Sequence, residues 1–152
     1  MTDTPSGGRS SQARPSGGRR TALEVVQEFL EYDGRLDADA QATLLSDDYV
    51  DEMIGREPLH GKVEITAESK RYFAAFPDYH REYLHLLHSG DFVTAHWRMT
   101  GTNTTSLTAE LPATGKRIDL LGCTIFEVRD GLIVHAWLYT DRLTMFQQLG
   151  LT

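Results

Sequence analysis

The 152-residue sequence predicts an α+β fold in which a strongly curved, mostly antiparallel sheet wraps around N-terminal helices. Helical spacing of apolar residues fills the first half of the chain, and strand patterns fill the second half. This segregation of helices from a meander of strands is typical of α+β domains. Asp130-Gly131 between two β-rich runs indicates a tight hairpin near the C-terminus.

The first twenty residues contain no large apolar side chain except Met1 and are rich in Ser, Gly, Pro and Arg. Such a segment buries too little surface to offset its ordering entropy. Residues 1–20 are therefore predicted to be a disordered tail, and residues 21–152 a single domain. The tail holds four of the 15 basic residues and one of the 22 acidic ones, so the body keeps 11 and 21, a net charge of −10.

This charge argues against a nucleic-acid partner, because phosphate binding needs a basic surface. No apolar run approaches the roughly 20 residues that cross a membrane, so no membrane partner is expected. Cys123, the only cysteine, rules out an internal disulfide and fits a cytoplasmic protein. Metal-binding, phosphate-loop and dinucleotide motifs are missing from the sequence, so we expect no metal site.

Helices are predicted in the first half of the chain. Thr21 and Glu24 have capping-box spacing and open a helix that ends near Asp33-Gly34. Pro77 ends the last of these helices, because proline cannot continue the hydrogen-bond ladder. The later segments are a helix at Asp37–Leu45, a strand starting at Asp47, and a helix at Val63–Phe76.

Strands are predicted from residue 79 onward. They are Tyr79–His88, Phe92–Thr102, a looser segment Thr104–Leu111, Lys116–Val128 and Leu132–Thr140, followed by a helix at Arg142–Leu149. The Lys116–Val128 strand is apolar on both parities, whereas a strand with one solvated face alternates. Both of its faces need cover, and the candidates are the protein's own helices and a second subunit.

Several short motifs recur in this order and spacing in a known family. They are Tyr32-Asp33-Gly34, Asp48-Tyr49-Val50-Asp51, Phe76-Pro77-Asp78, Gly90-Asp91-Phe92-Val93, Gly101-Thr102, Ala113-Thr114-Gly115-Lys116, Asp130-Gly131-Leu132-Ile133 through Trp137, Asp141, and Gln148-Leu149-Gly150. Over residues 21–150 the chain resembles the SnoaL-like polyketide cyclases of the nuclear transport factor 2-like superfamily.

The resemblance implies a cone-shaped, cystatin-like α+β barrel with a deep central apolar pocket and no cofactor. It also implies a homodimer formed through the outer face of the sheet. Family members include aldol-type ring cyclases of aromatic polyketide pathways, and relatives act as hydroxylases or open epoxides. The implied function is a cofactor-independent polyketide cyclase or isomerase of a natural-product pathway, such as antibiotic biosynthesis.

One position departs from the family. The best-known cyclases carry their acid/base Asp three residues before the residue that matches Asp141, and this chain has Leu138 there. Either another residue serves as acid/base, or ring closure proceeds by holding the substrate in a reactive fold, as in a cycloaddition. The loss also favours a non-catalytic small-molecule binder or an accessory protein of an oxygenase. An epoxide hydrolase is a third reading, although it would need the missing Asp.

Four residues are candidates for the chemistry, and each has a structural alternative. Asp141 could instead cap the Arg142–Leu149 helix, and Asp51 could be a solvated carboxylate at the pocket rim. Tyr32 could be a packing residue, and His96 shares its parity with polar neighbours on a solvent or interface face. The residues expected to contact substrate are Leu138, Trp137, Thr124, Ala136 and Phe126.

Overall fold

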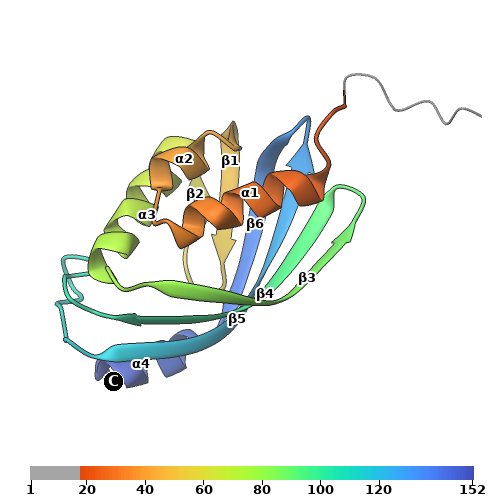
Figure 1. Cartoon of the computed structure of the whole chain (residues 1–152). Coiled ribbons are helices and arrows are strands. Elements are labelled where there is room, and N and C mark those ends of the chain that lie inside the picture. Colours follow the sequence, from red (N-terminus) through yellow and green to blue (C-terminus); the bar gives the residue numbers. More distant parts are fainter. Residues whose placement is uncertain (1–17) are drawn as a thin grey trace, which may run out of the picture.

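The computed structural model describes residues 18–152 and confirms the α+β prediction (Figure 1). The helices are α1 (Ala22–Gly34), α2 (Ala38–Ala42), α3 (Lys62–Ala75) and α4 (Arg142–Leu149). The strands are β1 (Leu45–Met53), β2 (Leu59–His60), β3 (His80–Ser89), β4 (Phe92–Thr102), β5 (Arg117–Arg129) and β6 (Leu132–Thr140). The tail was predicted to be disordered, and its residues 1–17 lie outside the described part of the chain.

The capping box predicted for α1 is present. The Glu24 amide donates to the Thr21 hydroxyl at 3.2 Å, and the Thr21 amide donates to the Glu24 carboxylate at 2.8 Å. These two bonds satisfy backbone donors that a helix start would otherwise leave unpaired.

The helix predicted at Asp37–Leu45 is shorter than expected. Asp37 caps α2, but the helix ends at Ala42, and Leu45 already pairs with Ile133 of β6. The Ile133 amide donates to the Leu44 carbonyl at 2.8 Å. Pairing with a distant strand therefore overrides the helical pattern at this point, which is a common limit of local propensity. The two-residue strand β2 was not predicted from the sequence.

The sheet has the order β2-β1-β6-β5-β4-β3. Strands β3 to β6 form an antiparallel meander, whereas β1 runs parallel to β6. The register shifts in β3–β4, in β5–β6 and in β1–β6, and such bulges bend strands. The resulting sheet curves around α1, α2 and α3, as Figure 1 shows.

The two faces of β5 are covered differently. Ile118, Leu120 and Phe126 are buried on the inner face, where Phe126 meets Phe29 of α1 edge-on at 5.6 Å between ring centroids. The side chain of Leu121 points to the outer face and is 59% exposed. The chain's own helices thus cover one apolar face of β5, as predicted.

The connection between β4 and β5 contains no strand, only a bridge between Thr108 and Leu111. Buried Asn103 organises it, because its side chain accepts from the Thr114 amide and donates to the Thr105 carbonyl, both at 2.8 Å. Within residues 18–152, no helix is long and apolar enough to cross a membrane.

Candidate active site

A cavity of about 400 Å³ lies between the helices and the inner face of the sheet. Its volume falls within the range of small-molecule pockets, about 300–1,000 Å³. Apolar and aromatic side chains make most of the wall, among them Phe29, Ile65, Tyr72, Phe73, Met99 and Leu120. The predicted central apolar pocket is therefore present.

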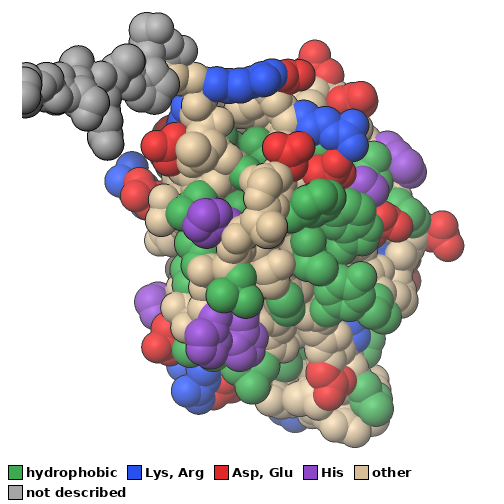
Figure 2. All heavy atoms as spheres, turned by 90° about the vertical axis from the view of Figure 1, so that its right-hand side faces the viewer, with side chains coloured by type: hydrophobic (Ala, Val, Ile, Leu, Met, Phe, Trp, Pro, Cys, Tyr) green, Lys and Arg blue, Asp and Glu red, His purple; other side chains and the backbone are tan. Residues whose placement is uncertain are grey.

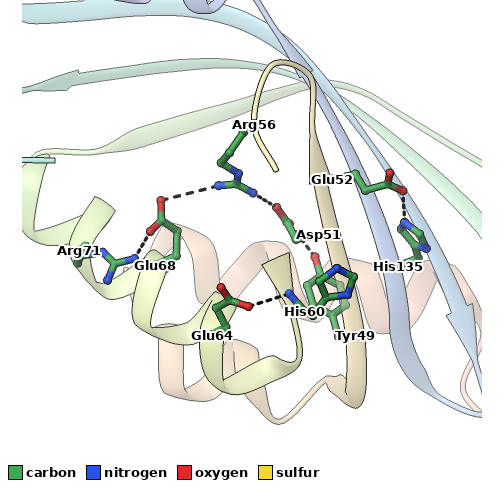
Figure 3. A network of polar contacts seen from close by, with 9 residues as sticks. All are labelled: Tyr49, Asp51, Glu52, Arg56, His60, Glu64, Glu68, Arg71 and His135. Carbon is green, nitrogen blue, oxygen red and sulfur yellow. Dashed lines mark hydrogen bonds and ion pairs between the residues drawn. The ribbon is translucent and has the colours of Figure 1, made fainter. Parts of the chain in front are cut away.

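Asp51 of β1 points into this cavity. Alternation along the strand places Tyr49, Asp51 and Met53 on the cavity side and sends Glu52 to the other face (Figure 3). The parallel register pairs Asp51 with Ala136 and Met53 with Leu138. The carboxyl group therefore lies one strand away from the position where the family's acid was expected.

The Asp51 carboxyl is held by two donors. The Tyr49 hydroxyl donates to one oxygen at 2.9 Å, and the Arg56 guanidinium donates to the other at 2.5 Å (Figure 3). The Asp51 side chain is only 16% exposed. Burial raises the pKa of Asp51, and the bonds from Tyr49 and Arg56 oppose this effect without cancelling it.

The network extends from Asp51 to helix α3. A second nitrogen of Arg56 lies 3.8 Å from the Glu68 carboxylate, which also pairs with Arg71 on the helix surface (Figure 3). Arg56 connects the loop after β1 to α3 and neutralises part of the negative charge at this end of the cavity. The acid is therefore fixed in place rather than free to rotate at a rim.

A second polar cluster lies on the cavity wall. Buried Asp33, at the end of α1, accepts hydrogen bonds from the hydroxyls of Tyr79 and Tyr83 at 2.9 and 3.0 Å. The side chain of Gln41 donates to the same carboxylate at 3.5 Å. Arg81 lies beside it, with 3.7 Å between the nearest nitrogen and oxygen. None of these residues was among the predicted site residues, although Tyr79, Arg81 and Tyr83 recur with strand period.

Five of the residues named from the sequence line the cavity: Asp51, Leu138, Thr124, Ala136 and Phe126. The Thr124 hydroxyl accepts a hydrogen bond of 3.0 Å from the indole nitrogen of Trp97, which fixes both side chains in the wall. Leu138 and Ala136 add an apolar surface beside Asp51.

Asp141 and Tyr32 lie elsewhere. Asp141 is exposed at the start of α4, where it accepts from the Thr144 amide at 2.9 Å and from the Thr144 hydroxyl at 2.7 Å. These bonds hold its pKa below the usual range. This is the helix-capping alternative considered for the residue. The Tyr32 hydroxyl donates to Glu28 at 2.6 Å, and its ring packs against the core without lining the cavity.

His96 and Trp137 lie on the outer face of the sheet. A nitrogen of His96 is 3.0 Å from one of His85, and Trp137 stacks on His135 at 3.9 Å between ring centroids. His135 in turn pairs with Glu52 (Figure 3). Neither His96 nor Trp137 contacts the cavity. Among residues 18–152 no three potential ligands gather to hold a metal ion.

The cavity thus combines an apolar volume with an enclosed carboxyl group of raised pKa. A carboxyl in such surroundings can exchange protons with a bound molecule near neutral pH more readily than an exposed one. Tyr49 and Arg56, which bond to that carboxyl, keep it oriented.

Solved structures share this fold. A candidate SnoaL-like polyketide cyclase from Jannaschia sp. CCS1 has a TM-score of 0.79 at 19% identity, covering 93% of this chain and 99% of that one. IdmH, a candidate polyketide cyclase from Streptomyces antibioticus, has a TM-score of 0.71 at 23% identity, covering 86% and 99%. An LEH-like epoxide hydrolase from M. tuberculosis has 0.67 at 23%, covering 84% and 88%. At these identities the likeness concerns the fold alone.

Comparison by sequence gives the family. No curated protein matches this chain significantly. The family described as SnoaL-like polyketide cyclase matches residues 20–149, a range that contains all the helices and strands described above. The chain belongs to the SnoaL-like polyketide cyclase family.

Proposed function

We propose that this protein is a cofactor-independent cyclase that closes a ring in a linear polyketide, with Asp51 as its acid/base. One observation carries the proposal: an oriented carboxyl group with raised pKa lies inside an apolar cavity, next to the strand that carries Leu138. Membership in a family of polyketide cyclases supports the substrate class. The cavity is large enough for a molecule of drug size.

In an aldol-type closure, ionised Asp51 removes a proton from a carbon between two carbonyl groups of the substrate. The carbanion, stabilised as its enolate, attacks a second carbonyl carbon of the same chain and forms the new carbon–carbon bond. The resulting alkoxide takes the proton back from Asp51. A raised pKa makes the Asp51 carboxylate a stronger base for the first transfer, and the protonated Asp51 is still far more acidic than the alkoxide that it protonates; the apolar wall excludes water from the intermediate.

The competing reading is a protein that binds a small molecule without converting it. Leu138 favours this reading, because it replaces the acid that the family's cyclases carry at this position. Asp51 would then have only a structural role, which is to anchor the loop that carries Arg56. A third outcome lies between them: the cavity closes the ring by folding the substrate and needs no acid/base.

The deciding experiment follows ring closure of a linear poly-β-carbonyl acid by chromatography and mass spectrometry. Asp51→Asn should lower the rate at least about 100-fold, the usual contribution of a general acid/base. Asp141→Asn is the matched control and should keep the wild-type rate, since Asn caps helices as well as Asp does.

Each other result has a distinct meaning. A wild-type rate no faster than the uncatalysed reaction would leave only the binding reading. Full activity in Asp51→Asn, together with loss in Leu138→Phe, would show that cavity shape and not proton transfer closes the ring.

We also propose that two copies associate through the outer face of the sheet. Leu87, Leu121 and Tyr139 on this face are 65%, 59% and 42% exposed. Figure 2 shows hydrophobic and histidine side chains gathered over this side of the molecule. Large apolar patches on a protein surface usually mark association sites.

The mass of the protein in solution tests this association. Leu121→Asp should convert a dimer into a monomer in light scattering after gel filtration, because it places a charge in the apolar face. Val63→Asp on α3, where Val63 is 82% exposed, is the matched control and should leave the mass unchanged. A monomeric wild type at about 100 μM would refute the proposal.

A further inference from the structure

Arg81 is a cation enclosed in the cavity wall. It lies on β3 with its side chain 18% exposed, and its guanidinium carbon is 4.4 Å from the ring centroid of Trp97 and 5.2 Å from that of Tyr79. Arginine keeps its charge at any pH a protein tolerates and presents five N–H donors in a plane. A buried guanidinium therefore needs acceptors around it.

The nearest carboxylate does not supply them. Asp33 already accepts from Tyr79, Tyr83 and Gln41. The closest approach of Arg81 to Asp33 is 3.7 Å, which is longer than a hydrogen bond. The Asp33 charge is thus satisfied by neutral donors, and the guanidinium is left beside it without a well-formed partner.

Arg81 is only partly satisfied within residues 18–152. Its Nε is enclosed and has no acceptor, its closest carboxylate oxygen is 3.7 Å away, and its hydrogen-bonding neighbour is the neutral hydroxyl of Tyr83. Arg56, the other arginine enclosed beside the cavity, also has an Nε without an acceptor, but one of its terminal nitrogens bonds to the Asp51 carboxylate at 2.5 Å. Leaving a buried donor unsatisfied costs about 1–3 kcal/mol, and more when the group is charged.

Arg81 and Asp51 both line the cavity, but their strands, β3 and β1, are far apart in the sheet. Strands β6, β5 and β4 separate β1 from β3. At about 4.8 Å per strand, the two residues are roughly 19 Å apart when measured along the curved sheet. A molecule that contacts both Arg81 and Asp51 would therefore have to span the cavity.

We propose that Arg81 binds a carboxylate of the ligand, so that the cavity selects hydrophobic carboxylic acids. The missing acceptors are supplied by the two carboxylate oxygens, which match the planar donors of a guanidinium. The apolar walls take the rest of the molecule. This inference rests on the proposed function in one respect: if the protein is a cyclase, the bound acid is its polyketide substrate. Binding at Arg81 would then orient the substrate with its reactive carbons toward Asp51.

Isothermal titration calorimetry with one charged and one uncharged probe tests the inference. The probes are 6-phenylhexanoate and 6-phenylhexanamide, which have nearly the same shape and differ in charge. At pH 7 the wild type should bind the acid at least about tenfold more tightly than the amide. Arg81→Gln should remove this preference and leave the affinity for the amide unchanged. Arg117→Gln, at an exposed strand residue, is the control and should bind both probes as the wild type does.

A second variant guards against a simple loss of folding. Asp33→Asn removes the negative charge next to Arg81 while its amide oxygen can still accept from Tyr79 and Tyr83. It should therefore bind the acid at least about fivefold more tightly than the wild type does, because a competing charge within a few ångströms has gone. A damaged protein cannot produce this gain.

Three results would overturn the proposal: equal affinity of the wild type for both probes, unchanged acid binding in Arg81→Gln, or no binding of the acid at about 1 mM. The titration involves no turnover. A failure of acid binding and a failure of Asp51-dependent ring closure are therefore separate results.

Discussion

Gly122 is a position where one added methyl group should cost several kcal/mol. A Cβ at Gly122 would lie 2.2 Å from Cζ2 and Cη2 of Trp97. Carbon atoms pack at about 3.5–4.0 Å, so Gly122→Ala must displace the indole or the backbone by more than about 1 Å. Trp97 is 2% exposed and pairs with Gly122 across β4 and β5, so the added methyl group must push the indole out of its place in the cavity wall.

Two effects add up in the expected loss of stability. Overpacking a dense core costs about 1–3 kcal/mol. Displacing the indole also breaks the 3.0 Å bond between Trp97 and Thr124, worth about 0.5–1.5 kcal/mol. We therefore expect Gly122→Ala to lower the free energy of unfolding by about 2–4 kcal/mol, or the melting temperature by roughly 6–16 °C.

Urea unfolding followed by circular dichroism and by tryptophan fluorescence measures this change. Gly34→Ala at the end of α1 is the matched control, because a Cβ there meets no atom within 4 Å. Its stability should stay within about 0.5 kcal/mol of the wild type or rise slightly. A loss below about 0.5 kcal/mol in Gly122→Ala would refute the claim that the indole is locked against the β5 backbone.

Three further predictions concern side chains that form specific hydrogen bonds. Thr21→Ala removes the hydroxyl that accepts from the Glu24 amide in the capping box of α1 and should lower the free energy of unfolding by about 1 kcal/mol in urea; an unchanged midpoint would contradict this. Tyr83→Phe removes a donor to buried Asp33 and should cost about 1.5–3 kcal/mol, whereas Tyr139→Phe on the outer face should cost less than about 0.5. Thr102 donates two bonds to Asp78 and lowers its pKa, so Asp78 stabilises the fold above its unfolded pKa of about 3.9 and loses this effect as the pH falls through the folded value. In Asp78→Asn the free energy of unfolding should therefore fall less steeply as the pH is lowered than it does in the wild type. The same slope in both proteins would contradict the lowered pKa of Asp78.

Much of the fold could be predicted because glycine and proline mark the element boundaries. The predicted bounds of β4 and β6 agree with the structure, since each strand lies between a Gly-containing turn and a break in its pattern. The N-cap at Asp141 likewise fixed the start of α4. The end of α2 could not be predicted from the neighbouring residues, because the backbone that follows it pairs with residues about 90 positions later.

The cavity wall was predictable where alternation is regular. Thr124, Phe126, Ala136 and Leu138 all carry the inward parity of their strands. Trp137 was also named as a contact residue, yet adjacent residues of a strand face opposite sides, so it cannot share a wall with Leu138.

Asp33 and Arg81 were missed for a different reason. Arg81 lies in a strand that reads as polar and exposed, and Asp33 reads as a helix-ending residue in the Tyr32-Asp33-Gly34 motif. Only the three-dimensional fold brings the end of α1 against β3. The spacing of Tyr79, Arg81 and Tyr83 was the one available signal, and its meaning depends on which face α1 covers.

The parallel pairing of β1 with β6 also sets the order in which the protein can assemble. Asp51 and Ala136 are partners in the register although 85 positions separate them. Closing a loop of that length costs about 4 kcal/mol of chain entropy, whereas the β3–β6 hairpins form between neighbours. We therefore expect β1 to dock after the meander has formed. A chain emerging from the ribosome would hold Asp51 apart from Ala136 and Leu138 until β6 is released, so the cavity wall that these residues share forms late in folding.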